Sequence, residues 1–263
     1  MYRQTGFDTH ISRKKSKPQI PYLSVVPSFD EEEDLPLEQP KLPSVSIVVP
    51  TLNEEKNLPH VLPQIPSWVK EIILVDGLST DKTVAVAKEI CPKIKVVYQT
   101  GKGKGDALQK GFSEATGDIV LAIDADGSTN PAEIPSFVGA LIAGKDYVKG
   151  SRFLQGGGTS DMEMIRRLGN FVLTWLVRIL FGGKYSDLCY GYFGFWKRVM
   201  PELYPECSGF EVETFINIRA LKAGLKIAEV PSYEERRIFG RSNLRTWHDG
   251  WRVLCTILRE KMV

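Results

Sequence analysis

Short apolar segments alternate with helical segments along most of the chain, and this order constrains the fold more than any other feature. Valine- and isoleucine-rich runs of strand length recur, and the stretches between two pairs of them have helical composition and period. The strand segments are 45–49, 71–75, 94–98 and 119–123, and the helical segments are 81–90 and 104–115. Because helices that join parallel strands cover both faces of the sheet, the pattern predicts an α/β fold with a mostly parallel central sheet flanked by helices.

Polar residues follow several of the predicted strands at the point where each strand ends. They lie at 50–55, at 76–77, in the loop before Lys104 and at 124–126. Ligands of open parallel sheets bind beyond the carboxyl ends of the strands. A purely structural sheet has no reason to repeat acidic residues at this edge, so the sequence predicts a site for a polar ligand and a metal.

The acidic pair Asp124 and Asp126 directly follows the apolar run 119–123. Charge at the end of a buried strand is costly unless a positive group lies between the carboxylates. A divalent cation with oxygen ligands is the usual partner, which makes the two aspartates the predicted metal ligands. An acidic turn after an edge strand is the alternative, and the pair alone does not exclude it.

The overall composition argues against several classes of protein. A formal charge of +2 over 263 residues gives no support for a nucleic-acid partner held by bulk electrostatics. The four cysteines and three histidines have no paired spacing, so we expect no disulfide framework and no zinc site, and a reducing, cytoplasmic compartment is favoured. The longest apolar run, 171–181, is too short for a bilayer span and contains Arg178, so we expect no integral membrane protein.

The N-terminal residues 1–43 differ in composition from the rest of the chain. They contain many prolines, a basic cluster and an acidic run, with little periodicity. This composition predicts a disordered tail, or a tail that drapes over the domain or binds a partner, ahead of one catalytic-size domain over 44–263.

Two amphipathic helices are predicted in the C-terminal half, at about 162–181 and 244–260. Both combine tryptophan with arginine, as Trp175 and Arg178 do in the first. Helices that lie on a bilayer surface have this composition, which predicts peripheral contact with the inner face of a membrane. Packing on the sheet, or a homodimer seam, explains the same pattern equally well.

Seven short motifs occur in order between residues 45 and 258. They read Val-Val-Pro-Thr-Leu-Asn-Glu-Glu, Leu-Val-Asp-Gly-x-Ser-Thr-Asp, Gly-Lys-Gly-x-Ala-Leu, Asp-Ala-Asp-Gly, Gly-Ser-Arg-Phe, Ser-Asp-x-x-x-Gly-Tyr and Gly-Phe-Glu-Val-Glu. In this order the chain resembles the family 2 glycosyltransferases of the GT-A type, and within them the dolichyl-phosphate mannose synthase and polyprenyl-phosphate glycosyltransferase group. The resemblance implies a GT-A (Rossmann-like) fold and an inverting hexosyltransferase that uses a nucleotide-sugar donor and Mn²⁺ or Mg²⁺.

The resemblance also implies roles for particular residues. Arg152 and Arg237 match basic residues that the group uses near donor or acceptor phosphates, a role that suits the forked guanidinium. The chain departs from many relatives at Gly77, Leu52 and Asn243, so the nucleotide base and the phosphate acceptor stay open. The implied nucleotide-sugar-binding residues are Pro50, Leu52, Glu54, Asp76, Lys104, Asp124 and Ala125, and the implied metal ligands are Asp124 and Asp126.

The acceptor decides whether catalysis needs a base. A polyprenyl phosphate is already an anionic nucleophile at neutral pH and needs none, whereas a hydroxyl of a glycan or a small molecule does. Asp187 in its loop and Glu213 at the start of a predicted helix are the candidate bases, and each also has a structural explanation. A non-catalytic protein that binds a nucleotide-sugar is a third alternative, against which the intact set of acidic and basic residues argues.

Overall fold

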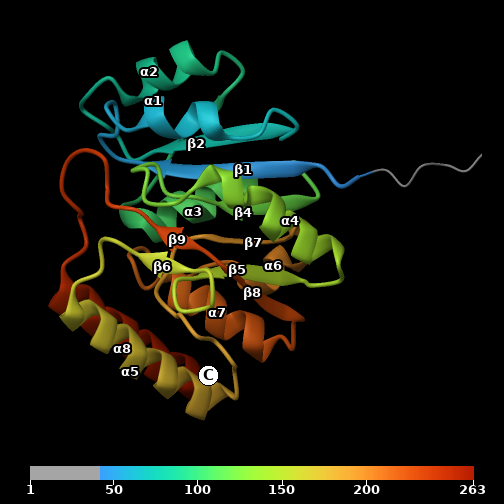
Figure 1. Ribbon diagram of the computed structural model, residues 1–263, viewed down its shortest axis with the longest axis vertical. Coiled ribbons are helices and arrows are strands. Elements are labelled where there is room, and N and C mark those ends of the chain that lie inside the picture. Colours follow the sequence, from blue (N-terminus) through green and yellow to red (C-terminus); the bar gives the residue numbers. More distant parts are fainter. Residues whose placement is uncertain (1–41) are drawn as a thin grey trace, which may run out of the picture. The chain divides into compact units, whose positions relative to one another are not determined.

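The protein is described by a computed structural model that covers residues 42–263 (Figure 1). The predicted tail, 1–43, lies outside this range except for its last two residues. The strands are β1 (Val45–Thr51), β2 (Glu71–Asp76), β3 (Lys95–Tyr98), β4 (Ile119–Ala122), β5 (Tyr147–Ser151), β6 (Gly158–Thr159), β7 (Phe193–Trp196), β8 (Ile227–Pro231) and β9 (Tyr233–Glu234). The helices are α1 (Leu58–Val61), α2 (Thr83–Ile90), α3 (Gly103–Glu114), α4 (Ile134–Ile142), α5 (Met164–Phe181), α6 (Met200–Leu203), α7 (Val212–Lys222) and α8 (Thr246–Met262).

The predicted strands and helices are all present, with ends that move by no more than two residues. Within the described residues, seven strands form one sheet in the order β3-β2-β1-β4-β7-β5-β8. The pairs among β3, β2, β1 and β4 are parallel, as is the pair of β5 with β8. The predicted class, a mostly parallel sheet flanked by helices, is confirmed.

Strand β7 was not predicted, and it runs antiparallel between β4 and β5. Its sequence, Phe-Gly-Phe-Trp, is short and shows no apolar-polar alternation. Three of its four residues are buried because both neighbouring strands and the helices on each side cover it. Only this tertiary position makes the segment a strand.

The residues of β1 alternate between the two faces of the sheet. Val45, Ile47 and Val49 pack into the cluster that contains α1, α2 and α4, whereas Val48 packs into the cluster that contains α3 and α7. β1 therefore buries both of its faces, as an apolar run of this kind requires. The first four strands end along one edge of the sheet, where β1 and β4 lie side by side.

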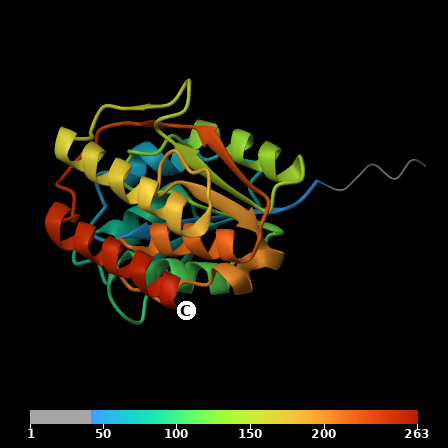
Figure 2. The same ribbon diagram turned by 90° about the horizontal axis from the view of Figure 1, so that it is seen from below.

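Helices α5 and α8 lie side by side, outside the helix α7 that covers the sheet (Figures 1 and 2). Val177 of α5, Ile218 of α7 and Val253 of α8 belong to one small apolar cluster, separate from the two clusters that line the sheet. In residues 42–263, no helix combines the length and the apolar character that crossing a bilayer requires.

The fit of α3 on the sheet supplies a test of the packing. A Cβ atom added at Gly111 would collide with a methyl group of Val48 and come within 3.0 Å of Val75, whereas one added at Gly139 of α4 would meet nothing within 4 Å. We expect Gly111→Ala to lower the free energy of unfolding by about 1–3 kcal/mol because it overpacks the core. Gly139→Ala should raise it by roughly 0.5–1 kcal/mol, since alanine is the better helix former. Urea unfolding of both variants would measure this, and a stable Gly111→Ala variant would contradict the packing described.

Candidate active site

A cavity of about 360 Å³ lies at the carboxyl ends of β1 and β4 and extends between α5 and α8. One end is polar, with residues that follow the strands, and the other is apolar, with side chains from the two helices. Polar residues at the first end include Glu54, Lys104, Asp124, Asp126, Glu213 and Arg237, and apolar ones at the second include Met162, Ile165, Leu173, Leu244 and Val253.

Lys104 connects two of the carboxylates at the polar end. Its Nζ lies 2.6 Å from Asp124 Oδ1 and 2.8 Å from Glu213 Oε1. Burial alone would lower the pKa of Lys104, but the two carboxylates raise it above its usual value, so the ammonium stays charged. Gly191 faces this cluster, and a Cβ atom there would lie 2.5 Å from Nζ, so only glycine leaves room for the three charged groups.

Arg237 holds the other two carboxylates. Its guanidinium lies 3.1 Å from Asp126 Oδ2 and 2.5 Å from Glu54 Oε1. Burial raises the pKa of Glu54, and Arg237 counteracts part of that rise. The two aspartates of the acidic pair are therefore each paired with a different cation, Lys104 on one side and Arg237 on the other.

The segment 235–245, between β9 and α8, brings Arg237 to the site, and we refer to it as the strap. The backbone N–H groups of Ile238 and Glu235 donate to the carbonyl oxygens of Asp126 and Ser128, at 3.1 and 3.0 Å. The N–H of Phe239 donates to the Asn57 side chain at 2.9 Å. The strap thus runs along the turn that carries the acidic pair and is fastened to the start of α1.

The end of β2 carries a buried acceptor with no hydrogen-bond partner. Asp76 Oδ2 accepts the N–H of Ser79 at 3.0 Å, while Oδ1 is buried and unpaired. An unpaired buried carboxylate oxygen costs free energy unless a ligand supplies a donor. Leu52, Gly77 and Pro50 line the adjacent wall of the cavity.

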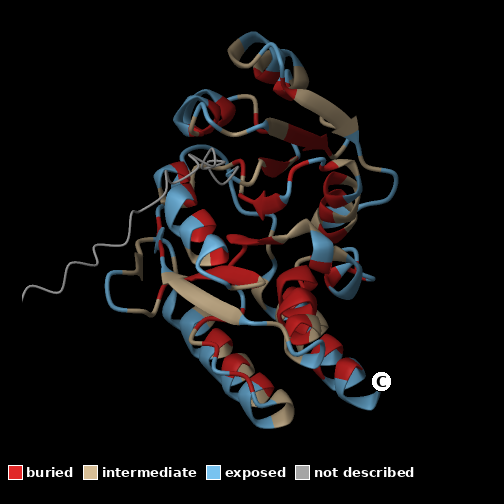
Figure 3. Cartoon of the chain, turned by 90° about the vertical axis from the view of Figure 1, so that its right-hand side faces the viewer, coloured by how far each residue is buried: buried red, intermediate tan, exposed pale blue. Residues whose placement is uncertain are grey.

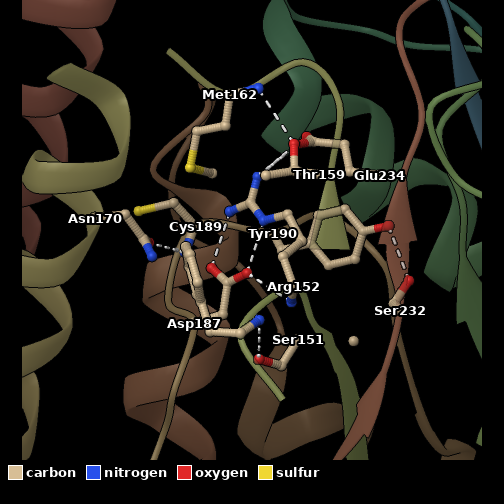
Figure 4. Close-up of polar contacts among 12 residues, drawn as sticks. Ser151, Arg152, Thr159, Met162, Asn170, Asp187, Cys189, Tyr190, Ser232 and Glu234 are labelled. Atoms are coloured by element: carbon tan, nitrogen blue, oxygen red, sulfur yellow. Dashed lines mark hydrogen bonds and ion pairs between the residues drawn. The ribbon is translucent and has the colours of Figure 1, made fainter. Parts of the chain in front are cut away.

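Arg152 lies at the centre of a buried ionic network between the two ends of the cavity (Figure 4). Its Nε and one terminal nitrogen donate to Asp187 at 2.7 and 2.9 Å, and the other terminal nitrogen donates to both oxygens of Glu234 at 3.0 Å. The guanidinium also lies 4.7 Å from the centre of the Tyr190 ring. Two carboxylates thus occupy the donors of Arg152, although the sequence suggested that it binds phosphate.

The Asp187 carboxylate is fully buried and does not line the cavity. Burial raises its pKa, but Arg152 beside it outweighs that effect and holds the pKa below its usual range. A carboxylate with no access to the cavity and two bonds to a guanidinium is poorly placed to take a proton from a substrate. This position argues against Asp187 as a base and leaves Glu213, which lines the cavity, as the better placed of the two candidates.

Lys149 binds the backbone of the loop that carries Asp187, and the sequence did not predict this role. Its side chain has no solvent exposure, and its ammonium donates to the carbonyl oxygens of Asp187 and Gly150, at 2.5 and 3.0 Å. Burial lowers the pKa of Lys149 while Asp187 and Glu229 partly restore it. No local sequence pattern indicates that a lysine in a strand is buried. Lys149 is buried only because the folded sheet and its loops cover it.

Helix α5 presents two polar residues to the cavity, one helical turn apart. Arg166 lines the cavity with an ion pair only at 3.9 Å, to Asp161. Asn170 accepts the N–H groups of Leu188 and Cys189 with its oxygen, at 3.3 and 3.0 Å, while its Nδ2 is buried without a partner. An unpaired buried N–H donor beside an arginine suits an anionic ligand.

The predicted site residues divide into two groups. Most of them line one cavity: Pro50, Leu52, Glu54, Lys104, Asp124, Ala125, Asp126, Arg152, Glu213 and Arg237. Asp76 and Asp187 lie behind the cavity wall and do not line it. Glu234, Asn170 and Arg166 were not predicted as site residues, and no local signal marks them: Glu234 ends the two-residue strand β9, and the other two lie within α5.

The acidic pair fits a divalent cation. Both carboxylates line the cavity and keep about a quarter of their side-chain surface exposed, 26% for Asp124 and 21% for Asp126. Oxygen ligands of this kind suit Mg²⁺ and Mn²⁺. Over residues 42–263 no group of three or more His, Cys, Asp or Glu side chains is arranged to hold a metal. The protein therefore offers two carboxylates, and a metal there needs further ligands from a substrate or from water.

Known proteins share both the sequence motifs and the fold of this chain. Residues 46–215 match glycosyl transferase family 2. The chain is 27% identical over 191 residues to Glycosyltransferase AglJ of Haloferax volcanii, and 32% identical over 180 residues to a dolichol-phosphate mannosyltransferase of Pyrococcus furiosus. These alignments cover 72% and 66% of this chain but only 62% and 51% of the two relatives.

A solved structure has a similar fold. Glucosyl-3-phosphoglycerate synthase from Mycobacterium tuberculosis, in complex with Mn²⁺, uridine diphosphate and glucosyl-3-phosphoglycerate, superimposes with a TM-score of 0.67. The two sequences are 26% identical, and the match covers 84% of this chain and 81% of that one. The fold is that of the GT-A glycosyltransferases. The chain belongs to glycosyl transferase family 2, as its motifs predicted.

The Arg152–Asp187 pair supplies a test by stability. Asp187→Asn should lower the free energy of unfolding by about 3–5 kcal/mol, because the buried guanidinium of Arg152 loses one of its two carboxylate partners. The folded pKa of Asp187 is depressed, so its stabilisation is present above the unfolded pKa of about 4 and is lost as pH falls below it. Urea unfolding between about pH 3 and 7 should show this loss in the wild type and a flatter profile in the variant.

Asp161→Asn is the matched control, because Asp161 is 40% exposed on the same cavity wall. It should change the free energy of unfolding by no more than about 0.5 kcal/mol. Equal effects of the two substitutions would contradict a structural role for Asp187.

Proposed function

We propose that this protein is an inverting, metal-dependent glycosyltransferase that transfers a sugar from a nucleotide-sugar to a polyprenyl phosphate. One observation carries the proposal: a single cavity joins the acidic rim at the strand ends to an apolar passage between α5 and α8. A nucleotide and an alkyl chain need these two environments, and the transferred sugar lies between them. A water-soluble acceptor has no need of the apolar passage.

The polar end suits the donor. Pro50, Leu52 and Gly77 would border the base, and Asp76 would hold the adjoining loop in place through its bond from the N–H of Ser79. Asp124 and Asp126 would hold Mn²⁺ or Mg²⁺ against the two phosphates. That cation would stabilise the charge that gathers on the nucleoside diphosphate as the sugar bond breaks. The relative from Mycobacterium tuberculosis, which binds uridine diphosphate and Mn²⁺, supports this arrangement.

The acceptor phosphate would lie against α5. Arg166 and Asn170 line this part of the cavity, and the Arg166 guanidinium and the unpaired Nδ2 of Asn170 would supply a charged and a neutral donor. A phosphate monoester is anionic at neutral pH and attacks without a base. The burial of Asp187 is compatible with such an acceptor, and the dolichol-phosphate mannosyltransferase among the relatives supports the choice.

A hydroxyl acceptor is the second candidate, because Glu213 faces the cavity beside Asp124 and Lys104. With such an acceptor Glu213 would serve as the base. Glu213→Gln discriminates between the two: transfer to a hydroxyl should fall steeply, by about 10²–10⁴-fold, whereas transfer to a lipid phosphate needs no base.

The outer face of α5 supports contact with a membrane. This helix buries the polar residues Asn170 and Thr174 and exposes large apolar ones on the opposite side. The exposed side chains are Met164, Leu168, Phe171, Val172, Trp175 and Ile179, and α8 adds Trp247 and Trp251. Figure 3 shows the corresponding exposed surface along α8, which ends at the label C. An apolar face beside the passage would let a lipid-linked acceptor enter directly from the bilayer.

The donor site is tested by Asp126→Ala. This variant should lose sugar transfer by at least about 100-fold, together with metal-dependent binding of the nucleotide, because one of two metal ligands is gone. Cooperative thermal unfolding would show that the fold persists. The control is Glu206→Ala, a 71% exposed carboxylate outside this cavity, which should keep its activity. Normal turnover in Asp126→Ala would exclude the metal assignment.

The membrane face is tested by flotation with liposomes of anionic lipids at low salt. Trp175→Glu should reduce the bound fraction several-fold, since it puts a charge into the apolar face of α5. Trp68→Glu is the matched control, because Trp68 is similarly exposed (51% against 56%) but belongs to neither α5 nor α8. Absence of wild-type binding, or equal loss in both variants, would count against this surface.

A further inference from the structure

The charged groups at the polar end form two closed ionic clusters. In one, Lys104 lies within 2.8 Å of both Asp124 and Glu213. In the other, Arg237 lies within 3.1 Å of both Asp126 and Glu54. Each carboxylate of the acidic pair therefore already has a cation of the protein where a divalent metal would bind. Since all six side chains are at least about three-quarters buried, water screens these pairs only weakly.

The charge balance of these six groups has a consequence for binding. Four carboxylates against two cations leave two negative charges uncompensated. The diphosphate of a nucleotide-sugar carries about two negative charges, so the donor alone would double this excess. A divalent cation alone would remove the excess but would compete with Lys104 and Arg237 for the same oxygens. Metal and diphosphate together leave the net charge of the site unchanged.

We propose that Lys104 and Arg237 are internal counterions of the acidic pair, which make the metal and the diphosphate bind as a unit. On joint binding, Asp124 and Asp126 would hold the metal, and the freed side chains of Lys104 and Arg237 would turn to the oxygens of the diphosphate. The forked guanidinium of Arg237 suits this exchange, since it holds phosphate as readily as carboxylate. The inference rests on the proposed function and adds how the binding of its two ligands is coupled.

The strap gives Arg237 the freedom to change partners. Most of its residues are exposed, Arg241 and Ser242 among them, and Gly240 has a positive φ of 81°. The residues on either side of Arg237 are held by backbone hydrogen bonds to the turn of the acidic pair. The Arg237 side chain can therefore exchange a carboxylate for a phosphate while its backbone stays in place.

Titration calorimetry on the full chain tests the inference without any measurement of activity. The probes are Mn²⁺ alone, uridine or guanosine diphosphate alone, and Mn²⁺ in the presence of the nucleotide that binds more tightly, after subtraction of the binding of Mn²⁺ to that nucleotide without protein. In the wild type we expect weak binding of Mn²⁺ alone and an affinity about 10–100-fold higher with the nucleotide, a usual size for coupling between two ligands.

Two variants then separate the two cations. Arg237→Gln and Lys104→Met should each raise the affinity for Mn²⁺ alone by several-fold and reduce the coupling, because each frees one carboxylate. The control is Arg241→Gln, which removes one positive charge from an exposed position of the strap and should change the coupling by less than about twofold. Two different clusters are tested, so loss of the fold in one variant leaves the other as evidence.

The outcomes distinguish the two proposals. If Mn²⁺ and nucleotide bind the wild type independently, or if Arg241→Gln acts like Arg237→Gln, the counterion inference is wrong while the proposed function stands. If wild-type protein binds neither probe in any combination, both are wrong.

Discussion

The architecture of this protein depends on the neutralisation of carboxylates at the carboxyl edge of one parallel sheet. β4 ends beside β1, and the turn that follows places Asp124 and Asp126 at the mouth of a cavity. Like charges this close, in a partly buried site, would repel strongly if they were alone. Lys104 from α3 and Arg237 from the strap compensate them, so the fold reaches a stable state in which an acidic site is already formed.

A second group of paired charges, more deeply buried, lies between the polar and the apolar end of the cavity. Arg152 follows β5 and binds Asp187 from one loop and Glu234 from β9. A buried ion pair contributes little net free energy, but it is costly to break, so it fixes the positions of its partners. The loop 186–192, which carries Cys189, Tyr190 and Gly191 to the cavity, is thereby held in one arrangement.

The C-terminal helices add an apolar region to the cavity at the strand ends. α5 and α8 pack on α7 through a small apolar cluster and leave larger apolar side chains on the outside. In water this arrangement is unfavourable because it leaves apolar surface exposed. Large patches of this kind are rare on soluble proteins. Under the proposed function the same arrangement would be favourable at a bilayer, which would bury the outer face and let the alkyl chain of the acceptor enter between the helices.

Much of the fold was readable from local patterns. The strands and helices between residues 45 and 123 follow from apolar runs, turn residues and period, because each segment buries a face that its own sequence marks. β7 was not readable, since Phe-Gly-Phe-Trp becomes a strand only when β4 and β5 lie on either side of it. The amphipathic helices were predicted, but which of their faces packs inward was not.

The same division applies to the site. By itself the sequence determined that two aspartates end a buried strand and that arginines follow later strands. The order of motifs along the chain is a property of the sequence and needs no tertiary structure. Only the tertiary structure decided which charges meet: Arg152 binds Asp187 and Glu234, while Arg237, more than a hundred residues from Asp126, reaches it through the strap. Ion pairs between distant segments depend on how the chain folds back on itself, and no local pattern encodes the partner of a charge.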